Sequence, residues 1–126
     1  MKHIPNIAAG LLGLAFIFFG LMFFFGPTPP APPEGSPIAL FMGAAYPTGF
    51  LTMVKVLEIL GGLLVAIPKT RNFGLLVLGP IVINIIAINI LIIGGGAVFA
   101  PPVIAVSVLS AYLLFTEREA FLKLLK

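Results

Sequence analysis

The chain has 126 residues, of which 60% are hydrophobic and only 9% charged, and its mean hydropathy is +1.23. Because soluble domains carry about 25% charged residues, this composition excludes a soluble globular domain and predicts one membrane domain, residues 1–126. The net charge of +3 involves no basic cluster interleaved with aromatics, so we expect no nucleic-acid partner. The absence of cysteine excludes disulfides, thiol exchange and iron–sulfur ligation.

Four apolar stretches follow one another, and each approaches or reaches the ~20 residues that span about 30 Å of hydrocarbon. Strict alternation of polar and apolar residues is missing, which argues against a barrel. The predicted fold is all-α, an integral membrane four-helix bundle with a short extra helix or lid in the outer loop. The expected segments are helices at 7–25, 48–67, 73–93 and 98–115, an outer loop at 26–47 and a tail at 116–126.

The first stretch is interpreted as a retained helix, because its apolar run is too long for a signal core and ends without a small-x-small cleavage site. Residues 26–37 then hold six of the twelve prolines, which favours a stiff connector over a proline-rich ligand. Residues 38–45 are apolar but too short to span. They predict a short helix that either anchors at the outer surface or covers the bundle as a lid.

The basic residues outside the bilayer fall on one side of this arrangement. The outer loop carries only Glu34, whereas the tail and the other loops on the opposite side carry Lys2, Lys69, Arg71, Arg118, Lys123 and Lys126. The positive-inside rule therefore predicts that both termini are cytoplasmic. The membrane itself is expected to be the plasma (inner) membrane of a prokaryote. In the tail, residues 116–119 fit a capping box that would open a new helix, although the fourth helix could also run on through Thr116.

The most informative polar residues are Lys55 and Glu58, which lie three positions apart on one face of the second predicted helix. Ionisable residues at bilayer depth are costly and are retained only when paired or functional. In a structural interpretation, this pair fixes the alignment of the second predicted helix against its neighbours. A functional interpretation makes it part of a pocket for a hydrophobic ligand with a polar head. Lys55 could also snorkel outward and leave Glu58 to another donor.

Further polar residues lie at a similar depth. Counted from the outer helix ends at about 1.5 Å per residue, Glu58, Asn84 and Ser107 all lie about 13–15 Å deep. We therefore expect Asn84 to donate to Glu58 with Ser107 nearby, whereas Asn89 lies about 140° from Asn84 around the same helix. The candidate ligand-binding residues are Lys55, Glu58, Asn84, Asn89, Ser107 and Thr52.

No catalytic constellation is recognisable. The single histidine, His3, lies in the terminal tail, no aspartate occurs, and Glu117 and Glu119 are expected in the cytoplasm. We therefore expect no catalytic residues, no metal site and no haem, and catalysis by this chain alone is not predicted.

Several segments resemble the DoxX family of small four-helix membrane proteins over essentially the whole chain. They are GLLGLAFIFFGLMFFF, the proline-rich loop with Phe41-Met42-Gly43, the block KVLEILGGLLV, residues 79–85 and Tyr112-Leu113-Leu114. Lys55, Glu58 and Asn84 match the family pattern. Asn89 stands where similar members have histidine, and Met22-Phe23 replace a polar pair.

The resemblance implies an accessory subunit or quinone-binding protein of a membrane redox or oxidative-stress system. Its expected partners are membrane lipids and redox-enzyme subunits, with a homo-oligomer as a further expectation. One alternative is a structural or lipid-interacting bundle. The other is a small proton-coupled transporter, which is less favoured because the membrane carboxylate has a lysine beside it and no tryptophan is present.

Overall fold

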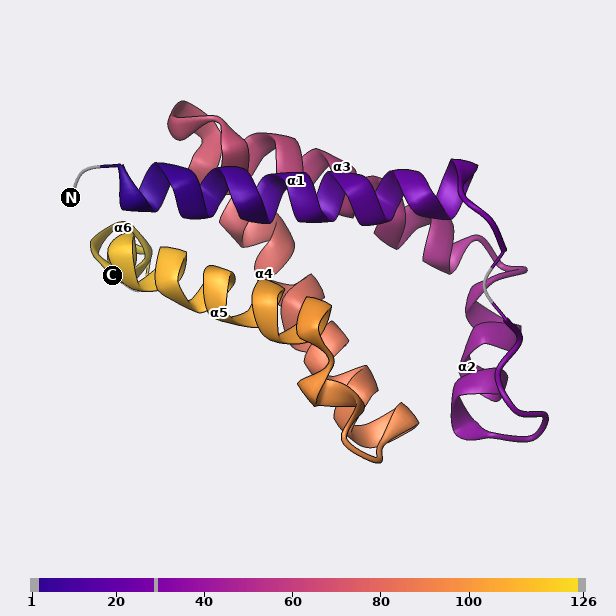
Figure 1. Ribbon diagram of the computed structural model, residues 1–126. Helices are drawn as coiled ribbons and strands as arrows, with labels where there is room; N and C mark the ends of the chain where they lie inside the picture. Colours follow the sequence, from indigo (N-terminus) through magenta and orange to yellow (C-terminus); the bar gives the residue numbers. More distant parts are fainter. Residues whose placement is uncertain (1–2, 29, 125–126) are drawn as a thin grey trace.

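The computed structural model describes residues 3–28 and 30–124, which are helical and contain no strand. This confirms the all-α prediction. In chain order the elements are α1 (Ile4–Phe25), α2 (Pro37–Ala45), α3 (Phe50–Ala66), η1 (Pro68–Thr70), α4 (Arg71–Ala87), η2 (Ile88–Ile93), η3 (Ala97–Phe99), α5 (Pro101–Thr116) and α6 (Arg118–Lys123) (Figure 1).

Two of these helical segments are long and apolar enough to cross a membrane. They are α1 and the continuous segment Pro68–Ile93, which contains α4. Helices α2 and α3 make a third span if they are taken together, although the chain bends by 82° between them. Helix α5 is apolar but shorter, with 16 residues. The membrane prediction is therefore confirmed for two or three helices.

Helices α1 and α3 run side by side because glycines remove the side chains between them (Figure 1). A Cβ on Gly13 would lie 2.6 Å from the Gly62 carbonyl oxygen, and one on Gly62 would lie 2.7 Å from the Gly13 carbonyl oxygen. Gly20 makes a second close approach, against the Ile59 side chain. Small residues of this kind let membrane helices associate through backbone contact.

The opposite side of α3 meets α4 in the same way. A Cβ on Gly61 would lie 2.6 Å from the Leu78 side chain, and one on Gly74 would lie 2.6 Å from the Val65 backbone nitrogen. Helix α3 therefore lies between α1 and α4, while α5 packs against both α1 and α4.

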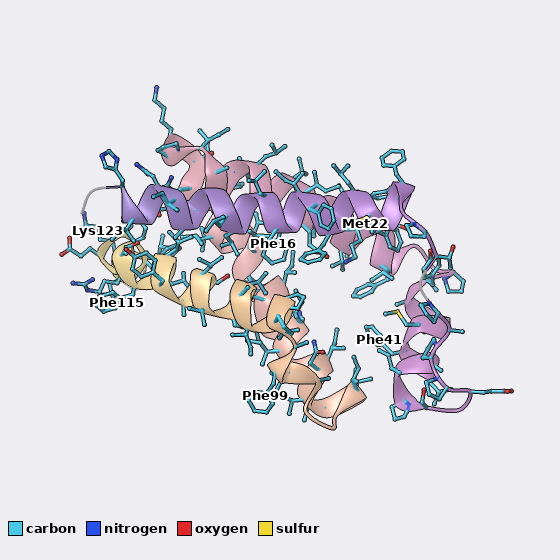
Figure 2. The ribbon with its side chains drawn as sticks, viewed as in Figure 1. Phe16, Met22, Phe41, Phe99, Phe115 and Lys123 are labelled. Atoms are coloured by element: carbon cyan, nitrogen blue, oxygen red, sulfur yellow. The ribbon has the colours of Figure 1, made fainter. Side chains whose placement is uncertain are left out.

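Burial divides the molecule into two halves. The packed half, defined as residues 8–16, 58–66, 71–82 and 106–116, holds nearly all the buried side chains, with Phe16 among the most buried (Figure 2). The open half consists of residues 17–25, 50–57, 83–93 and 97–105, and Gly20 is its only buried residue. In Figure 1 the chain ends lie at the packed end, and α5 diverges from α1 toward the open end.

Helix α2 confirms the short helix expected in the outer loop. Ser36 caps it by accepting a hydrogen bond from the Ala39 backbone N–H, and Pro37 occupies its first position. It lies at the open end beyond α3 and contacts η2, with Phe41 on its inner side (Figure 2). Gly49, with φ of 83°, takes the left-handed conformation that the turn into α3 requires.

Two local features of the helices differ from the sequence prediction, one near the C-terminus and one at residues 88–93. A break at Glu117 separates α5 from α6, but the predicted capping box is not observed. Glu117, not Thr116, is the N-cap residue of α6, and the Thr116 hydroxyl donates to the Leu113 carbonyl. Residues 88–93 form a π-helix that the sequence analysis did not anticipate. There the Asn89 amide donates to the Ile85 carbonyl at 2.7 Å, so its side chain is engaged with its own helix.

Candidate functional site

The predicted pairing of Lys55 with Glu58 is present on α3, at the boundary between the packed and open halves. The lysine Nζ lies 3.3 Å from Glu58 Oε2. The two side chains differ in exposure, at 23% for Lys55 and 5% for Glu58. The carboxylate is thus enclosed by protein, whereas the ammonium reaches the molecular surface.

Local packing explains this asymmetry. Glu58 lies one turn before Gly61 and Gly62, where α4 and α1 approach α3 most closely, so its side chain is enclosed at the start of the packed half. Lys55 lies one turn further toward the open half. A Cβ on Gly20 would lie 3.3 Å from the Lys55 carbonyl, so α1 covers the lysine backbone while the neighbouring residues of the open half leave the side chain partly accessible.

The Lys55 ammonium has donor capacity beyond the ion pair. An ammonium carries three N–H donors, and Glu58 is its only hydrogen-bonding or ion-pair partner among residues 3–28 and 30–124. In hydrocarbon a donor without a partner is costly. The arrangement can therefore bind the carbonyl or another polar head of a lipid-soluble molecule, while Glu58 holds the lysine in place.

The other predicted site residues do not gather around this pair. Asn84 is exposed and makes no hydrogen bond to Glu58, so the expected donation is not observed. Thr52 is also exposed, and Asn89 is engaged with its own helix. Ser107 does place its hydroxyl inside the protein, where it has no partner among the described residues, as does Ser110 one turn later.

Sequence reasoning missed the role of Arg71, which was interpreted only as a cytoplasmic loop cation. Arg71 is 6% exposed. Its Nε donates to the Val65 carbonyl and its Nη1 to Asn6 Oδ1, each at 3.0 Å. Thr70 donates to the Leu64 carbonyl at 2.8 Å. The available signal was a threonine and an arginine just after a helix end, where both can cap free carbonyls.

Arg71 joins three helices, because Val65 lies in the last turn of α3, Asn6 lies in the first turn of α1 and Arg71 itself begins α4. This contact closes the packed half at the end where the termini lie. The Arg71 contacts therefore lie at one limit of the packed half, and the Lys55–Glu58 ion pair lies at the other limit.

Two shallow apolar depressions lie away from the ion pair. One is on α1, lined by Phe18, Leu21, Met22, Phe25 and Gly26, and one is at the α2–α3 bend, lined by Phe41, Ala44, Ala45, Thr48 and Phe50. Within residues 3–28 and 30–124, no three histidine or acidic side chains come together as metal ligands would.

No match was found when the chain was compared with protein families, with curated proteins and with solved structures.

Proposed function

We propose that this chain is a DoxX-like integral membrane protein that binds a quinone or similar polar-headed lipid and serves a membrane redox or oxidative-stress system without itself being a catalyst. The observation that carries the proposal is the asymmetric ion pair. Glu58 is enclosed, whereas Lys55 has spare donors and reaches the surface at the inner limit of the open half. A quinone carbonyl is an acceptor that such an ammonium can bind.

The sequence resemblance to DoxX proteins supports the link to redox chemistry, since Lys55, Glu58 and Asn84 stand at matching positions. Redox-enzyme subunits are the protein partners that we propose on this basis. Quinone is held only by hydrogen bonds and apolar contacts in this proposal, without covalent attachment or metal ligation.

In the proposed topology the chain crosses the membrane four times, as a bundle of α1, α3 extended by α2, α4 extended by η2, and α5 extended by η3. The basic side chains Lys69, Arg71, Arg118 and Lys123 belong to the end where both termini lie, so this end is cytoplasmic by the positive-inside rule (Figure 1). The membrane is the plasma membrane of a prokaryote.

Cysteine labelling tests this topology, because the natural chain has no cysteine. Thr28→Cys in the outer loop and Glu119→Cys in α6 both replace exposed residues. A membrane-impermeant maleimide applied to intact cells should label position 28 alone, and label position 119 only after the cells are opened. Labelling of both from outside would contradict the four-crossing arrangement.

Thermal unfolding in lipid nanodiscs, followed by circular dichroism, tests the ligand. Decyl-substituted benzoquinone should raise the melting temperature of the natural chain by mass action, whereas a decyl chain without the quinone ring should not. Lys55→Met should abolish the increment. Lys69→Met is the matched control, because Lys69 is an exposed lysine remote from the ion pair.

A second function, a purely structural bundle, is favoured by one observation: Lys55 and Glu58 pair with each other at 3.3 Å beside the closest helix contacts. The same experiment separates the two. If quinone leaves the natural chain's melting temperature unchanged while Lys55→Met lowers it, the pair is architectural and the quinone proposal is wrong.

A further inference from the structure

Asn84 is a polar side chain in an unusual place. It lies in α4, within the membrane-spanning segment Pro68–Ile93, about 13 Å from the outer end of that segment. Its side chain is exposed, and it makes no side-chain hydrogen bond within residues 3–28 and 30–124. An amide has two N–H donors and an acceptor oxygen. In hydrocarbon neither water nor lipid headgroups reach that depth, so the amide needs a partner from another protein surface.

The residues around Asn84 form a continuous stripe, which we call the Asn84 stripe. Its members follow at alternating intervals of four and three residues and are Phe73, Val77, Pro80, Asn84 and Ala87. This is the spacing of the a and d positions of a coiled coil. Phe73 is 62% exposed, Pro80 is also exposed, and Val77 and Ala87 are partly exposed.

The Asn84 stripe lies mostly apart from the face of α4 that packs inside the molecule. That buried face consists of Arg71, Gly74, Leu75, Leu78, Ile81 and Val82. One stripe member, Val77, also packs against α3, since a Cβ on Gly61 would lie 3.3 Å from its Cγ1, whereas Phe73, Pro80 and Asn84 are exposed.

The chemistry of the stripe fits a second copy of the same surface. An amide is self-complementary, since each of two facing asparagines can donate to the oxygen of the other. A two-fold axis brings identical residues together, so one Asn84 meets its own copy there. The small Ala87, one turn beyond Asn84, lets two helices approach closely there, as membrane helix interfaces require. The stripe carries no charge that would select a partner of opposite charge.

We propose that two copies of this chain associate through the Asn84 stripes of their α4 helices, with the two Asn84 amides hydrogen-bonded to each other across a two-fold axis. A single asparagine in such a seam also fixes the alignment of the two helices, because any sliding separates the amides.

Energy transfer between donor- and acceptor-labelled chains in liposomes of phosphatidylethanolamine and phosphatidylglycerol measures this association as the protein-to-lipid ratio is varied. Asn84→Leu should weaken the dimer by roughly three- to twentyfold, the range for interhelical hydrogen bonds in membranes. Asn84→Gln should keep part of the association. Asn89→Leu is the matched control, because that amide already serves the Ile85 carbonyl of its own helix, and it should leave the dimer unchanged.

Disulfide crosslinking gives a second measurement that does not require removing Asn84. Ala87→Cys on the stripe should form a crosslinked dimer under mild oxidation in the same liposomes. Val108→Cys on α5, where Val108 is 60% exposed, should not. Equal crosslinking of the two cysteines, or a natural chain that stays monomeric at all protein-to-lipid ratios, would overturn the proposal.

Discussion

The packed and open halves of this protein contain the same helices, and the open half is the richer in apolar residues, yet only the packed half has a core. The difference follows the glycines. In the packed half a Cβ on Gly13, Gly61, Gly62 or Gly74 would lie within 3 Å of a neighbouring helix, whereas in the open half only one on Gly20 would do so. Lipid is as apolar as leucine, so apolar side chains alone do not drive helices together in a membrane. Close backbone approach is what distinguishes the two halves.

The largest effect expected from a single substitution lies at the boundary between the halves. Lys55→Met leaves the enclosed Glu58 carboxylate without its partner and should lower stability by about 3–5 kcal/mol. Glu58→Gln should cost less, because the remaining lysine is already 23% exposed and can reach further outward. The double variant should recover part of the loss. Melting temperatures in detergent measure all three, and equal losses in both single variants would contradict the asymmetry.

At the far end of the packed half, Arg71→Leu removes the donor to the Val65 carbonyl and the link to Asn6. Hydrogen bonds from charged groups contribute about 1.5–3 kcal/mol, so a destabilisation of about that size is expected. Lys69→Leu, two residues earlier and exposed, should change the melting temperature little. If both variants melt alike, the three-helix closure does not stabilise the packed half.

Two glycines of α1 give a direct test of backbone approach. Gly13→Ala places a methyl group 2.6 Å from the Gly62 carbonyl, and we expect it to destabilise by about 1–3 kcal/mol through overpacking. Gly10→Ala, in the same helix, meets nothing within 4 Å and should stabilise by about 0.5–1 kcal/mol. The comparison uses the same change of residue, so opposite signs in the melting temperature isolate the helix contact.

The open half should be the least sensitive. Its aromatic contact between Phe23 and Tyr46 has ring centroids 5.4 Å apart, and Tyr46 is 55% exposed. Tyr46→Leu should therefore cost only about 0.5 kcal/mol, the lower end for an aromatic pair. A loss as large as that of Arg71→Leu would show that α2 contributes more stability at the open end than its burial indicates.

Much of the helical pattern was predictable from the sequence. Apolar runs bounded by Pro and Gly place α1, α3, α5 and the segment formed by α4 and η2 within a few residues of their observed ends, and Ser36-Pro37 marks the start of α2. The π-helix η2 was not predictable, because nothing in residues 88–93 distinguishes a π turn from an α turn. The break at Glu117 was anticipated as one alternative, but by a cap that does not form.

Contacts in the candidate site were predictable only where the spacing of two residues along one helix determines whether they meet. Lys55 and Glu58 meet because three residues on one helix fix their separation. The contact between Asn84 and Glu58 depends instead on how α4 is rotated about its axis. A helix that is apolar on every side gives no periodic signal of its buried face. Contacts such as Gly61 with Leu78 and Gly74 with Val65 set that rotation, and they leave Asn84 outside.

The hydrogen bond between Asn6 and Arg71 also bears on how the protein is made. These residues lie 65 positions apart in the chain. At a synthesis rate of about 5–20 residues per second, Asn6 exists for roughly 3–13 s before Arg71 is added. During that interval α1, which is long and apolar enough to cross a membrane, lacks its contact with the arginine. The closure of α1, α3 and α4 therefore cannot form until more than half of the chain has been made.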